Sequence, residues 1–600
     1  MLQGITGKML FVNLSDGSIA EEETDQQLYR DYLGGYGLGA KIIFERQKAG
    51  VDALGPDNTL GFLTGPLTGT PVPGGNRYVV VGKSPLTGGW GDANSGGDFG
   101  PYLKFAGYDA VFFTGASDKP VYLAIRDGKA ELKDAGHLWG KDSYDTEDVI
   151  QAELGKDMRI ACIGPAGEAQ ALISCIINNK GRAAGRSGLG AVMGSKKLKA
   201  IAVYGKADVT VADKDTIDTL RKDDLVKLKS HKLADRLRDF GTFAGTMGQL
   251  AVRGVPTKNW GGVGPRDFPK TEAANEELVP YQEKRYGCWR CPVACGGHMK
   301  AGVSYKYDAG SHKPEYETAV AFGTMCLNDS LESVIMANDI CNRQGLDTIS
   351  AGGTIAFAIE CYENGLITKE DTGGIELKWG DHKAIIAMLE KMGKGEDIGA
   401  TLANGSKAAA EVIGKGSEQY AIHIGGQEMP YHDPKTNPAY ACTYKIDPTP
   451  ARHTQGGVAS GDGSEQKEKN TFCQAYNSAG LCFWFNVLLG MDTVSQYMAA
   501  VTGHPYDTGA MLEVGERVSN IRQAFNIREG INPVDRKVNG RISGTPPQTE
   551  GPAAGVTVNV DERVEAYYKQ MDWDLKTGKP SRKKLEQLGM KDVADALYPV

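Results

Sequence analysis

Short hydrophobic runs separated by tight turns dominate the first 210 residues. Residues 10–14 and 121–125 are apolar runs that each lead into a turn containing Asp-Gly, which is typical of β-hairpins. Further apolar runs at residues 78–81, 110–114 and 200–204 predict strands. The runs follow one another too closely for a regular βαβ array, so the pattern predicts a mainly β region.

The hydrophobic period changes after about residue 210. Apolar positions within residues 217–228 recur among Lys, Arg and Asp, and a second helical pattern starts at Leu331 and ends near Gly345. The remaining two-thirds of the chain is therefore predicted to be mainly helical, which places the fold in the α+β class. The mixed charges of residues 221–239 are typical of a solvated helix face.

Composition limits the classes of function. The 600 residues are 41% hydrophobic and carry a net charge of -8, with Lys and Arg dispersed along the chain. This predicts a large globular protein of three or four domains and argues against nucleic acid as the main partner. No basic-then-apolar signal pattern begins the sequence, and no apolar run approaches the roughly 18 residues of a membrane helix. We therefore predict a cytoplasmic protein without a membrane span.

Three cysteines lie close together in a turn rich in Gly and Pro. Cys288, Cys291 and Cys295 have the spacing C-x2-C-x3-C, which can hold three corners of an iron-sulfur cubane. Cys482, in a glycine-marked turn, is the best candidate for the fourth ligand. Two other interpretations compete with the cluster: His298 completes a Cys3His pattern for zinc, and the thiols could be unligated. Most other cysteines are isolated in apolar segments, as expected of reduced, buried thiols.

Glycine-rich segments, two of which contain arginines, mark the β region. They are residues 74–77, which end in Arg77 and lead a strand, and the polar glycine loops of residues 90–97 and 178–186. An arginine presents a planar fork to phosphate while nearby backbone amides approach the same anion, so these loops predict a site for a phosphorylated cofactor. The alternative is ordinary surface loops with solvated arginines. The glycine motifs at residues 34–39 and 185–190 are weak dinucleotide signals, because neither clearly follows a strand in a βαβ unit.

Two short segments of the helical region share one pattern. Residues 342–347 and 477–482 both read N-x-x-G-L followed by Asp or Cys. A pair of similar turns predicts that two equivalent halves of one ligand are held.

Together these motifs resemble the aldehyde ferredoxin oxidoreductase family of tungsten enzymes. The resemblance runs over essentially the whole chain. Its six separated motifs occur in the family's order: Arg77, residues 90–97, residues 182–196, the cysteines of 288–295, residues 314–317 and the two N-x-x-G-L turns. It implies an N-terminal β-rich domain that forms the base for a pyranopterin cofactor, residues 1–210, and two mainly α-helical domains, residues 211–415 and 416–600.

The resemblance also implies the cofactors. Tungsten would be held by the dithiolene sulfurs of two pyranopterins, with no protein atom bound to the metal, next to a 4Fe-4S cluster; molybdenum shares this ligand set. The cluster ligands would be Cys288, Cys291, Cys295 and Cys482. Arg77 and Arg182 would contact the pterin phosphates, and Asn94 with the Ala183 carbonyl would help to hold a bridging Mg²⁺.

The two turns would each grip one pterin. The residues involved would be Asn342, Asp347, Asn477 and Leu481. The first position of each turn is commonly Asp in the family, whereas this chain has Asn at both, which keeps the acceptor oxygen and loses the charge.

Oxidising an aldehyde to an acid requires oxygen from water, a base, a donor to polarise the carbonyl and a sink for two electrons. The resemblance assigns the base to Glu315, with Glu317 as the alternative, and the donor to His453. Electrons would leave through the cluster to ferredoxin or a ferredoxin-like subunit, because the chain has no second cysteine cluster and no convincing flavin or nicotinamide site. Bacterial relatives assemble with such subunits and a flavoprotein, so we expect an oligomer or larger complex that docks around Cys288.

Two other functions fit parts of the pattern. The tungsten subunit of a benzoyl-CoA reductase would share the cofactor motifs, so turnover of a thioester against a free aldehyde separates the two reactions. A zinc-stabilised binding protein would use the three clustered cysteines and His298, and it would leave the arginine loops unexplained.

Overall fold

Two six-stranded sheets form the N-terminal part of the computed structural model, which describes residues 2–245, 254–269, 277–456 and 463–599. The strand order is β2-β1-β6-β3-β4-β5 in the first sheet and β11-β10-β9-β12-β7-β8 in the second. Neighbouring strands are antiparallel except for the parallel pairs β1–β6 and β7–β12.

The strands and helices of this part have the following bounds. The first sheet contains β1 (Lys8–Asn13), β2 (Ser18–Glu23), β3 (Leu60–Thr64), β4 (Tyr78–Lys83), β5 (Trp90–Ser95) and β6 (Ala110–Thr114). The second contains β7 (Val121–Arg126), β8 (Lys129–Asp134), β9 (Arg159–Cys162), β10 (Ile176–Asn178), β11 (Arg182–Ala184) and β12 (Leu198–Tyr204). The helices are α1 (Gln26–Tyr32), α2 (Gly35–Arg46), α3 (Phe99–Phe105), α4 (Ser143–Leu154), α5 (Pro165–Glu168) and α6 (Leu189–Ser195).

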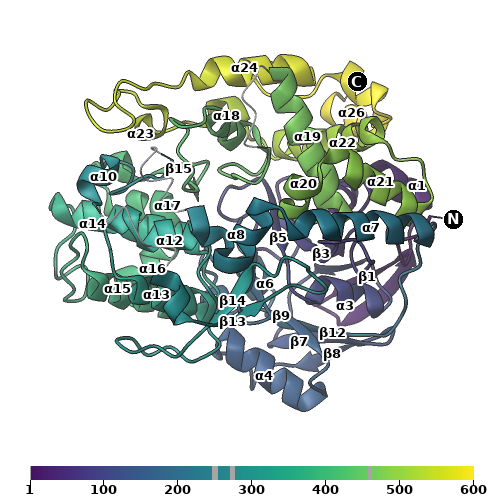
Figure 1. Cartoon of the computed structure of the whole chain (residues 1–600), viewed down its shortest axis with the longest axis horizontal. Coiled ribbons are helices and arrows are strands. Elements are labelled where there is room, and N and C mark those ends of the chain that lie inside the picture. The colour runs from purple at the N-terminus through teal and green to yellow at the C-terminus, as the bar shows by residue number, and fades with distance from the viewer. Residues whose placement is uncertain (1, 246–253, 270–276, 457–462, 600) are drawn as a thin grey trace.

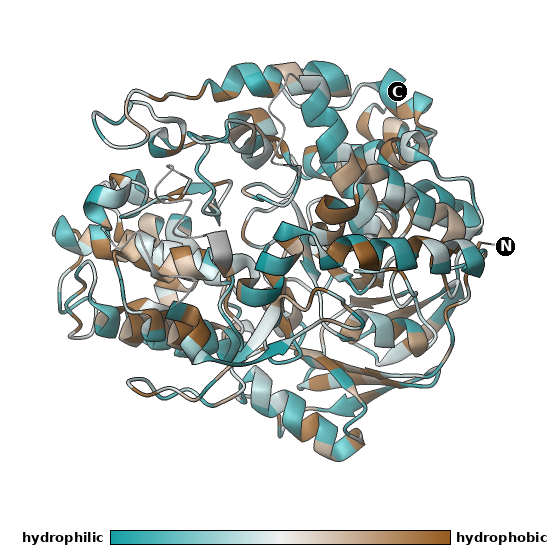
Figure 2. Ribbon diagram, viewed as in Figure 1, coloured by the Kyte–Doolittle hydropathy of each residue, from teal (hydrophilic) through white to brown (hydrophobic). Residues whose placement is uncertain are grey.

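Side-chain alternation gives the first sheet two buried faces. In β4, Tyr78 and Val80 lie in the core between the two sheets, whereas Val79 and Val81 lie in a core shared with α2 and the C-terminal helices. The far face of the second sheet is covered by α4, through Ile150. Figure 2 colours hydrophobic residues brown, and several of these strands are largely brown. The first sheet is therefore the layer on which the C-terminal helices rest.

The rest of the chain is mainly helical. Its first helices are α7 (Lys214–Lys229), α8 (Lys232–Phe240), α10 (Gly264–Asp267), α12 (Tyr316–Phe322), α13 (Leu331–Gln344), α14 (Thr348–Glu363), α15 (His382–Lys394), α16 (Ile398–Leu402) and α17 (Gly405–Ile413). They continue with α18 (Ala439–Ile446), α19 (Gly463–Ala479), α20 (Phe483–Leu489), α21 (Met491–Thr502), α22 (Thr508–Arg528), α23 (Gly540–Ser543), α24 (Val560–Met571), α25 (Arg582–Gln587) and α26 (Lys591–Leu597). Short 3₁₀ turns are η1 (Gly241–Gly245), η2 (Val279–Tyr281), η3 (Thr324–Cys326), η4 (Ser417–Tyr420) and η5 (Pro533–Asp535).

Two small hairpins interrupt this helical part: β13 (Gln282–Tyr286) pairs with β14 (Gly296–Met299), and β15 (His423–Ile424) pairs with β16 (Gln427–Glu428). Helices α12–α17 share one core, whereas α19, α21 and α22 pack on the first sheet in another. Figure 1 shows these two groups on different sides of the molecule, with both termini beside the second group.

The predicted α+β class is confirmed. The strands expected at residues 10–14, 78–81, 110–114, 121–125 and 200–204 are present, and the expected helices correspond to α7 and α13. The division into three domains stays a prediction. Among the helices in the described ranges, none combines the length and apolar character needed to cross a bilayer.

The segment of residues 90–97 differs from its prediction. It was expected to be a polar glycine loop, but Trp90–Ser95 is strand β5, paired along its length with β4 from Lys83 to Tyr78. Glycine and Asp are depleted in strands, so local preference argues against this outcome. Pairing with β4 and burial of the side chains override that preference.

A buried group of four charged side chains joins three distant segments. Asp92 of β5 accepts hydrogen bonds from Arg522 of α22 at 2.6 Å and from Arg452 at 3.2 Å. Arg522 also donates to Asp447 at 2.9 Å. Burial alone would raise the pKa of Asp92, but Arg522 and Arg452 hold it below its ordinary value. Because Arg452 directly precedes His453, this group fixes a predicted site residue to the N-terminal sheet.

Replacing Arg522 with Met should lower the free energy of unfolding by about 3–5 kcal/mol, because Asp92 and Asp447 would be left buried without this partner. Arg285→Met is the matched control: its ion pair with Asp239 is 49% exposed on both sides, so its loss should cost about 0–1 kcal/mol. Denaturant unfolding measures both changes. Equal losses in the two variants would contradict a special role for the buried group.

Candidate active site

The four predicted cluster cysteines lie together. The loop that connects strands β13 and β14 carries Cys288, Cys291 and Cys295. Cys482 is the N-cap of α20. Burial, with contributions from neighbouring thiols that include Cys288 and Cys482, raises the pKa values of Cys291 and Cys295 to about 12. Such thiols keep their protons at neutral pH and release them when metal binds, so metal loading of this loop releases protons.

Two partly buried arginines lie beside these cysteines. Arg77 donates to Cys482 Sγ at 3.2 Å, and Arg182 donates to Glu315 at 3.2 Å. The Nε of Arg77, and the Nε and Nη2 of Arg182, are buried and find no acceptor among the described residues. The two guanidinium groups also repel each other. Buried cationic donors without acceptors fit an anionic group such as a phosphate.

The zinc interpretation does not fit the geometry. Two ligand atoms of one zinc ion lie at most about 4.6 Å apart, because each Zn–S bond is about 2.3 Å long. Glu317, His432 and His453 form the one set of three or more His, Cys, Asp or Glu side chains in the described ranges whose ligand atoms all lie within 4.8 Å of one another. No set of three cysteines there meets this limit. His298 Nδ1 instead lies 2.8 Å from the Gly310 carbonyl oxygen. The sulfurs are therefore spread too widely for a single zinc ion.

The two N-x-x-G-L turns have the same backbone design. Each begins in the last turn of a long helix, α13 or α19, and contains a left-handed glycine, Gly345 with φ 75° or Gly480 with φ 81°. The next residue, Leu346 or Leu481, is buried, and a new helix starts two residues after the leucine. The carbonyl oxygens of both glycines accept backbone hydrogen bonds from the N-terminal part of the chain. Both turns therefore face the sheet region.

The polar side chains of the turns make different contacts. Asn477 accepts a hydrogen bond from Asn94 Nδ2 at 3.0 Å, so two predicted cofactor residues meet. Asp347 caps α14 and lies 3.4 Å from Arg186. The Nδ2 of Asn342 is buried and donates to no described residue. This unsatisfied donor is a further position that a bound polar group would satisfy.

Ala183 and Leu481 contribute backbone. Ala183 lies in β11 opposite Ile177, and β11 packs against β5, the strand of Asn94. The N–H of Leu481 donates to the Tyr476 carbonyl at 3.1 Å and closes the second turn. The predicted cofactor residues therefore line the region where β5, β11 and the two turns face one another.

A glutamate and two histidines form a second cluster of functional groups. Glu317 Oε1 lies 3.4 Å from His432 Nε2 and 3.6 Å from His453 Nδ1. This oxygen is buried and has no hydrogen bond with any described residue, whereas Oε2 accepts one from the Tyr431 N–H at 2.9 Å. The two imidazole rings are 5.1 Å apart. One carboxyl oxygen is thus shared between two imidazoles.

The environment sets where the proton resides. Burial raises the pKa of Glu317 to about 8, and burial lowers the pKa of His432 to about 4. The pKa of His453 is held well below its ordinary value by burial and then by His432 and Arg452. Near neutral pH, the proton therefore resides on Glu317 and both imidazoles are neutral.

Glu315 faces different partners. It is the N-cap of α12, and its carboxylate accepts from Arg182 and from the Thr242 hydroxyl. It has no hydrogen bond or ion pair with His453 in the described part of the chain. The geometry therefore favours the alternative glutamate, Glu317, as the partner of His453.

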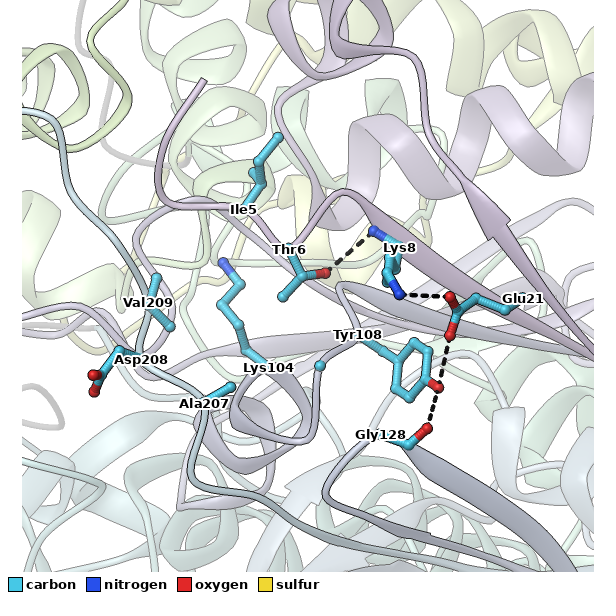
Figure 3. Close-up of a pocket in the computed structure, with 11 residues that line it drawn as sticks. Ile5, Thr6, Lys8, Glu21, Lys104, Tyr108, Gly128, Ala207, Asp208 and Val209 are labelled. Atoms are coloured by element: carbon cyan, nitrogen blue, oxygen red, sulfur yellow. Dashed lines mark hydrogen bonds and ion pairs between the residues drawn. The ribbon is translucent and has the colours of Figure 1, made fainter. Parts of the chain in front are cut away.

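A separate cavity of about 310 Å³ lies between the start of β1 and the loop after β12. Figure 3 shows Lys8, Glu21 and Tyr108 linked along its wall. Lys104 donates to the carbonyl oxygens of Gly4 and Gly65. These polar groups already have partners, and none of the predicted site residues lines this cavity.

Comparison with known proteins identifies the family. The description "Aldehyde ferredoxin oxidoreductase, N-terminal domain" matches residues 9–205, and "Aldehyde ferredoxin oxidoreductase, domains 2 & 3" matches residues 219–590. The chain belongs to the aldehyde ferredoxin oxidoreductase family. The prediction of an oxidoreductase of this type is confirmed.

Relatives match over nearly full length. The chain is 36% identical to the tungsten-containing aldehyde ferredoxin oxidoreductase of Pyrococcus furiosus over 98% of this chain and 99% of the relative. The enzyme of the same name from Thermococcus kodakarensis is also 36% identical, with the same coverage. A solved structure, the active site complex BamBC of benzoyl coenzyme A reductase with 1,5-dienoyl-CoA, matches with TM-score 0.84 and 27% identity, over 99% of this chain and 98% of that one.

Several site residues were not found from the sequence of this family member. His432 is an isolated histidine, and only the fold brings it to Glu317. Tyr316 and Tyr440 stack on its two sides, and Arg186 donates to the Glu428 carbonyl at 2.5 Å behind the site. Arg186 lies in the motif of residues 182–196 and Tyr316 in that of residues 314–317, so both carried a signal, whereas His432 and Tyr440 had none.

Replacing Gly480 with Ala should destabilise the protein more than replacing Gly395 with Ala. Both glycines have a positive φ, 81° and 68°, so each variant loses about 1–2 kcal/mol to left-handed strain. A Cβ at Gly480 would lie 2.1 Å from Thr68 Oγ1, whereas one at Gly395 meets no heavy atom within 4 Å. The steric contact should add about 1–3 kcal/mol for Gly480→Ala. Thermal unfolding of the pair isolates this difference, and equal melting temperatures would contradict the close approach.

Proposed function

We propose that this chain oxidises aldehydes to carboxylic acids, with Glu317 as the base and His453 as the hydrogen-bond donor to the substrate oxygen. The observation that carries the proposal is the buried Oε1 of Glu317, which has no hydrogen bond with a described residue and is shared between two neutral imidazoles. A carboxylate with a pKa near 8 is a strong base once ionised, and it can take a proton from a water molecule that attacks an aldehyde carbon. The neutral ring of His453 keeps one N–H to polarise the carbonyl.

Membership of a tungsten enzyme family implies a tungsten pyranopterin cofactor, and the residues fit one. Arg77 and Arg182 would bind its phosphates, because their buried donors lack acceptors among the described residues. Asn94 and the Ala183 carbonyl would offer oxygen ligands to Mg²⁺. The two N-x-x-G-L turns, through Asn342, Asp347, Asn477 and Leu481, would hold the two pterins. When bound, the cofactor supplies the sink for the electron pair.

Four cysteines would hold a 4Fe-4S cluster next to this cofactor. Cys288, Cys291, Cys295 and Cys482 gather beside Arg77, whose hydrogen bond to Cys482 Sγ links the two sites. The loop lies at the surface, with Arg290 exposed and the three loop cysteines partly exposed. A ferredoxin or ferredoxin-like subunit could therefore approach the cluster closely, which supports the cysteine loop as its docking face.

A second candidate function is supported by the solved structure of a benzoyl coenzyme A reductase complex. Its TM-score of 0.84 supports a shared fold with a complex that binds 1,5-dienoyl-CoA. Aldehyde oxidation is favoured, because the aldehyde ferredoxin oxidoreductases are 36% identical to this chain and that complex is 27% identical. Assaying benzaldehyde and benzoyl-CoA in parallel separates the two.

Anaerobically purified protein should reduce a viologen dye when an aldehyde is added, and kcat/KM should rise as pH increases through about 8. The reason is that Glu317 is protonated below its raised pKa and becomes a base above it. The reverse reaction, which needs the protonated acid, should lose rate over the same interval. Glu317→Gln should lower kcat/KM by about 10²- to 10⁴-fold.

Glu315→Gln is the matched comparison for this experiment. Glu315 pairs with Arg182, so its loss should leave the pH dependence in place. Loss of turnover in Glu315→Gln with normal turnover in Glu317→Gln would assign the base to Glu315 instead. Turnover of benzoyl-CoA without aldehyde activity would replace the proposal with the benzoyl-CoA reductase.

Cys482→Ser should reduce the iron content from about four atoms per chain and remove the brown absorption of a cluster, because one of its four ligands is lost. Cys442→Ser is the matched control, since Cys442 is a buried thiol in the core between α18 and α24. Iron and tungsten analysis of both variants measures the effect. A wild-type protein that binds zinc and no iron would overturn the cluster proposal.

A further inference from the structure

His432 is held between two tyrosine rings. Its ring stacks on Tyr316 at a centroid distance of 4.6 Å with planes 21° apart, and on Tyr440 at 5.2 Å and 20°. The Tyr444 hydroxyl donates to the His432 carbonyl at 2.9 Å and fixes the backbone. Aromatic contacts on both faces restrict rotation of the imidazole. The ring therefore keeps its Nε2 directed at Glu317, 3.4 Å away.

The other ring nitrogen of His432, Nδ1, forms no hydrogen bond with any residue in the described ranges. The side chain as a whole is 27% exposed. Glu317 is only 11% exposed, and its Oε1 is buried. A proton on Glu317 therefore lies close to an imidazole that reaches solvent, whereas its own oxygen does not.

The two histidines near Glu317 differ in their electrostatic surroundings. Arg452 and Arg186 both oppose a positive charge on His453, in addition to burial. Burial is the one cause that lowers the pKa of His432. A transient imidazolium is therefore less costly on His432 than on His453. Because His453 would also be occupied with the substrate oxygen, His432 is the better acceptor for a departing proton.

We propose that His432 is a proton-relay residue that takes the proton from Glu317 and releases it to solvent. The proposal rests on the function proposed above. Aldehyde and water give the carboxylic acid, two protons and two electrons, and the electrons go to the bound redox cofactor. One proton moves from the attacking water to Glu317 Oε1; the Oε1–H bond then breaks as an Nε2–H bond forms on His432, and Nδ1 gives up a proton to water. His432 acts through Glu317 and does not touch substrate.

The titratable groups around this relay come from several elements. Those that face Glu317 or His432 are Tyr316 of α12, Tyr440 and Tyr444 of α18, Tyr431, His453, Arg186 and Asp347. Arg186 favours the ionised form of Glu317 and Asp347 opposes it. The tyrosines have raised pKa values through burial, so they stay neutral over the range in which Glu317 titrates.

The His432→Gln variant distinguishes a proton-relay role of His432 from a purely packing role. Gln keeps a hydrogen-bonding group beside Glu317 but cannot carry a proton, so kcat for aldehyde oxidation should fall on the order of 10- to 100-fold while KM changes little. His432→Ala leaves space for added imidazole, which should restore part of kcat in proportion to its concentration. His423→Gln is the matched control: its ring is also neutral, with a pKa near 4, and accepts the Gly426 N–H outside this site. It should keep the wild-type rate.

An infrared measurement on the protein without substrate tests the contact independently of turnover. The C=O stretch of protonated Glu317, assigned by its absence in Glu317→Gln, should move to higher wavenumber in His432→Phe, where the acceptor is lost. His432→Gln should keep it near the wild-type position. If the band shifts in His432→Phe but the wild-type protein does not oxidise aldehydes, the proposed function fails and the Glu317–His432 contact stands.

Three outcomes would overturn the relay. The first is a wild-type kcat and pH profile in His432→Gln. The second is the lack of a protonated Glu317 band at pH 6. The third is one tightly bound zinc or iron per wild-type chain that is lost in both Glu317→Gln and His432→Ala, because this would show that the two residues hold a metal ion.

Discussion

The buried group of Asp92, Arg452, Arg522 and Asp447 is the interaction on which the rest of the site depends. Burying two carboxylates and two guanidinium groups carries a large desolvation cost, and it is tolerated only where hydrogen bonds satisfy the charges. Here Asp92 also accepts from the Trp90 indole N–H at 2.8 Å, and Arg522 donates to a glutamine side chain at 2.6 Å. The charges therefore specify one arrangement of β5, α22 and the segment that leads to the candidate active site.

The position of Asp92 determines more than one contact. Asn94 lies two residues further along β5, so the two side chains point to the same face of the strand. Fixing Asp92 therefore aims Asn94 at Asn477, in the second of the two turns. On the other side, Arg452 carries His453 as its direct neighbour. The buried group of four charged side chains thus fixes the region proposed to hold the cofactor relative to His453, the histidine proposed to bind the substrate oxygen.

Local patterns predicted much of this structure, whereas contacts between distant segments could not be read from the sequence. The hairpin strands, α7, α13 and the paired turns follow from hydrophobic period and from glycine positions. Strand β5 could not be predicted, because its Gly- and Asp-rich sequence favours a loop and only β4 makes it a strand. The choice between Glu315 and Glu317 was equally hidden. Glu315 is the N-cap of α12 with an extended backbone, whereas Glu317 lies in the first turn, so their side chains leave the chain in different directions. Knowing where α12 starts does not say which of them faces the histidines.

That geometry has a chemical consequence. Glu315, at the N-cap of α12, faces Arg182 on the side of the cysteines, and Glu317 faces His432 and His453. The first turn of α12 therefore separates a side rich in thiols and guanidinium groups from a side rich in imidazoles. Electrons released by aldehyde oxidation have to reach metal centres, which the first side is suited to hold, whereas protons have to reach water through titratable groups. Separating the two routes keeps the positive charges of Arg77 and Arg182 away from His432, whose pKa is lowered by burial alone.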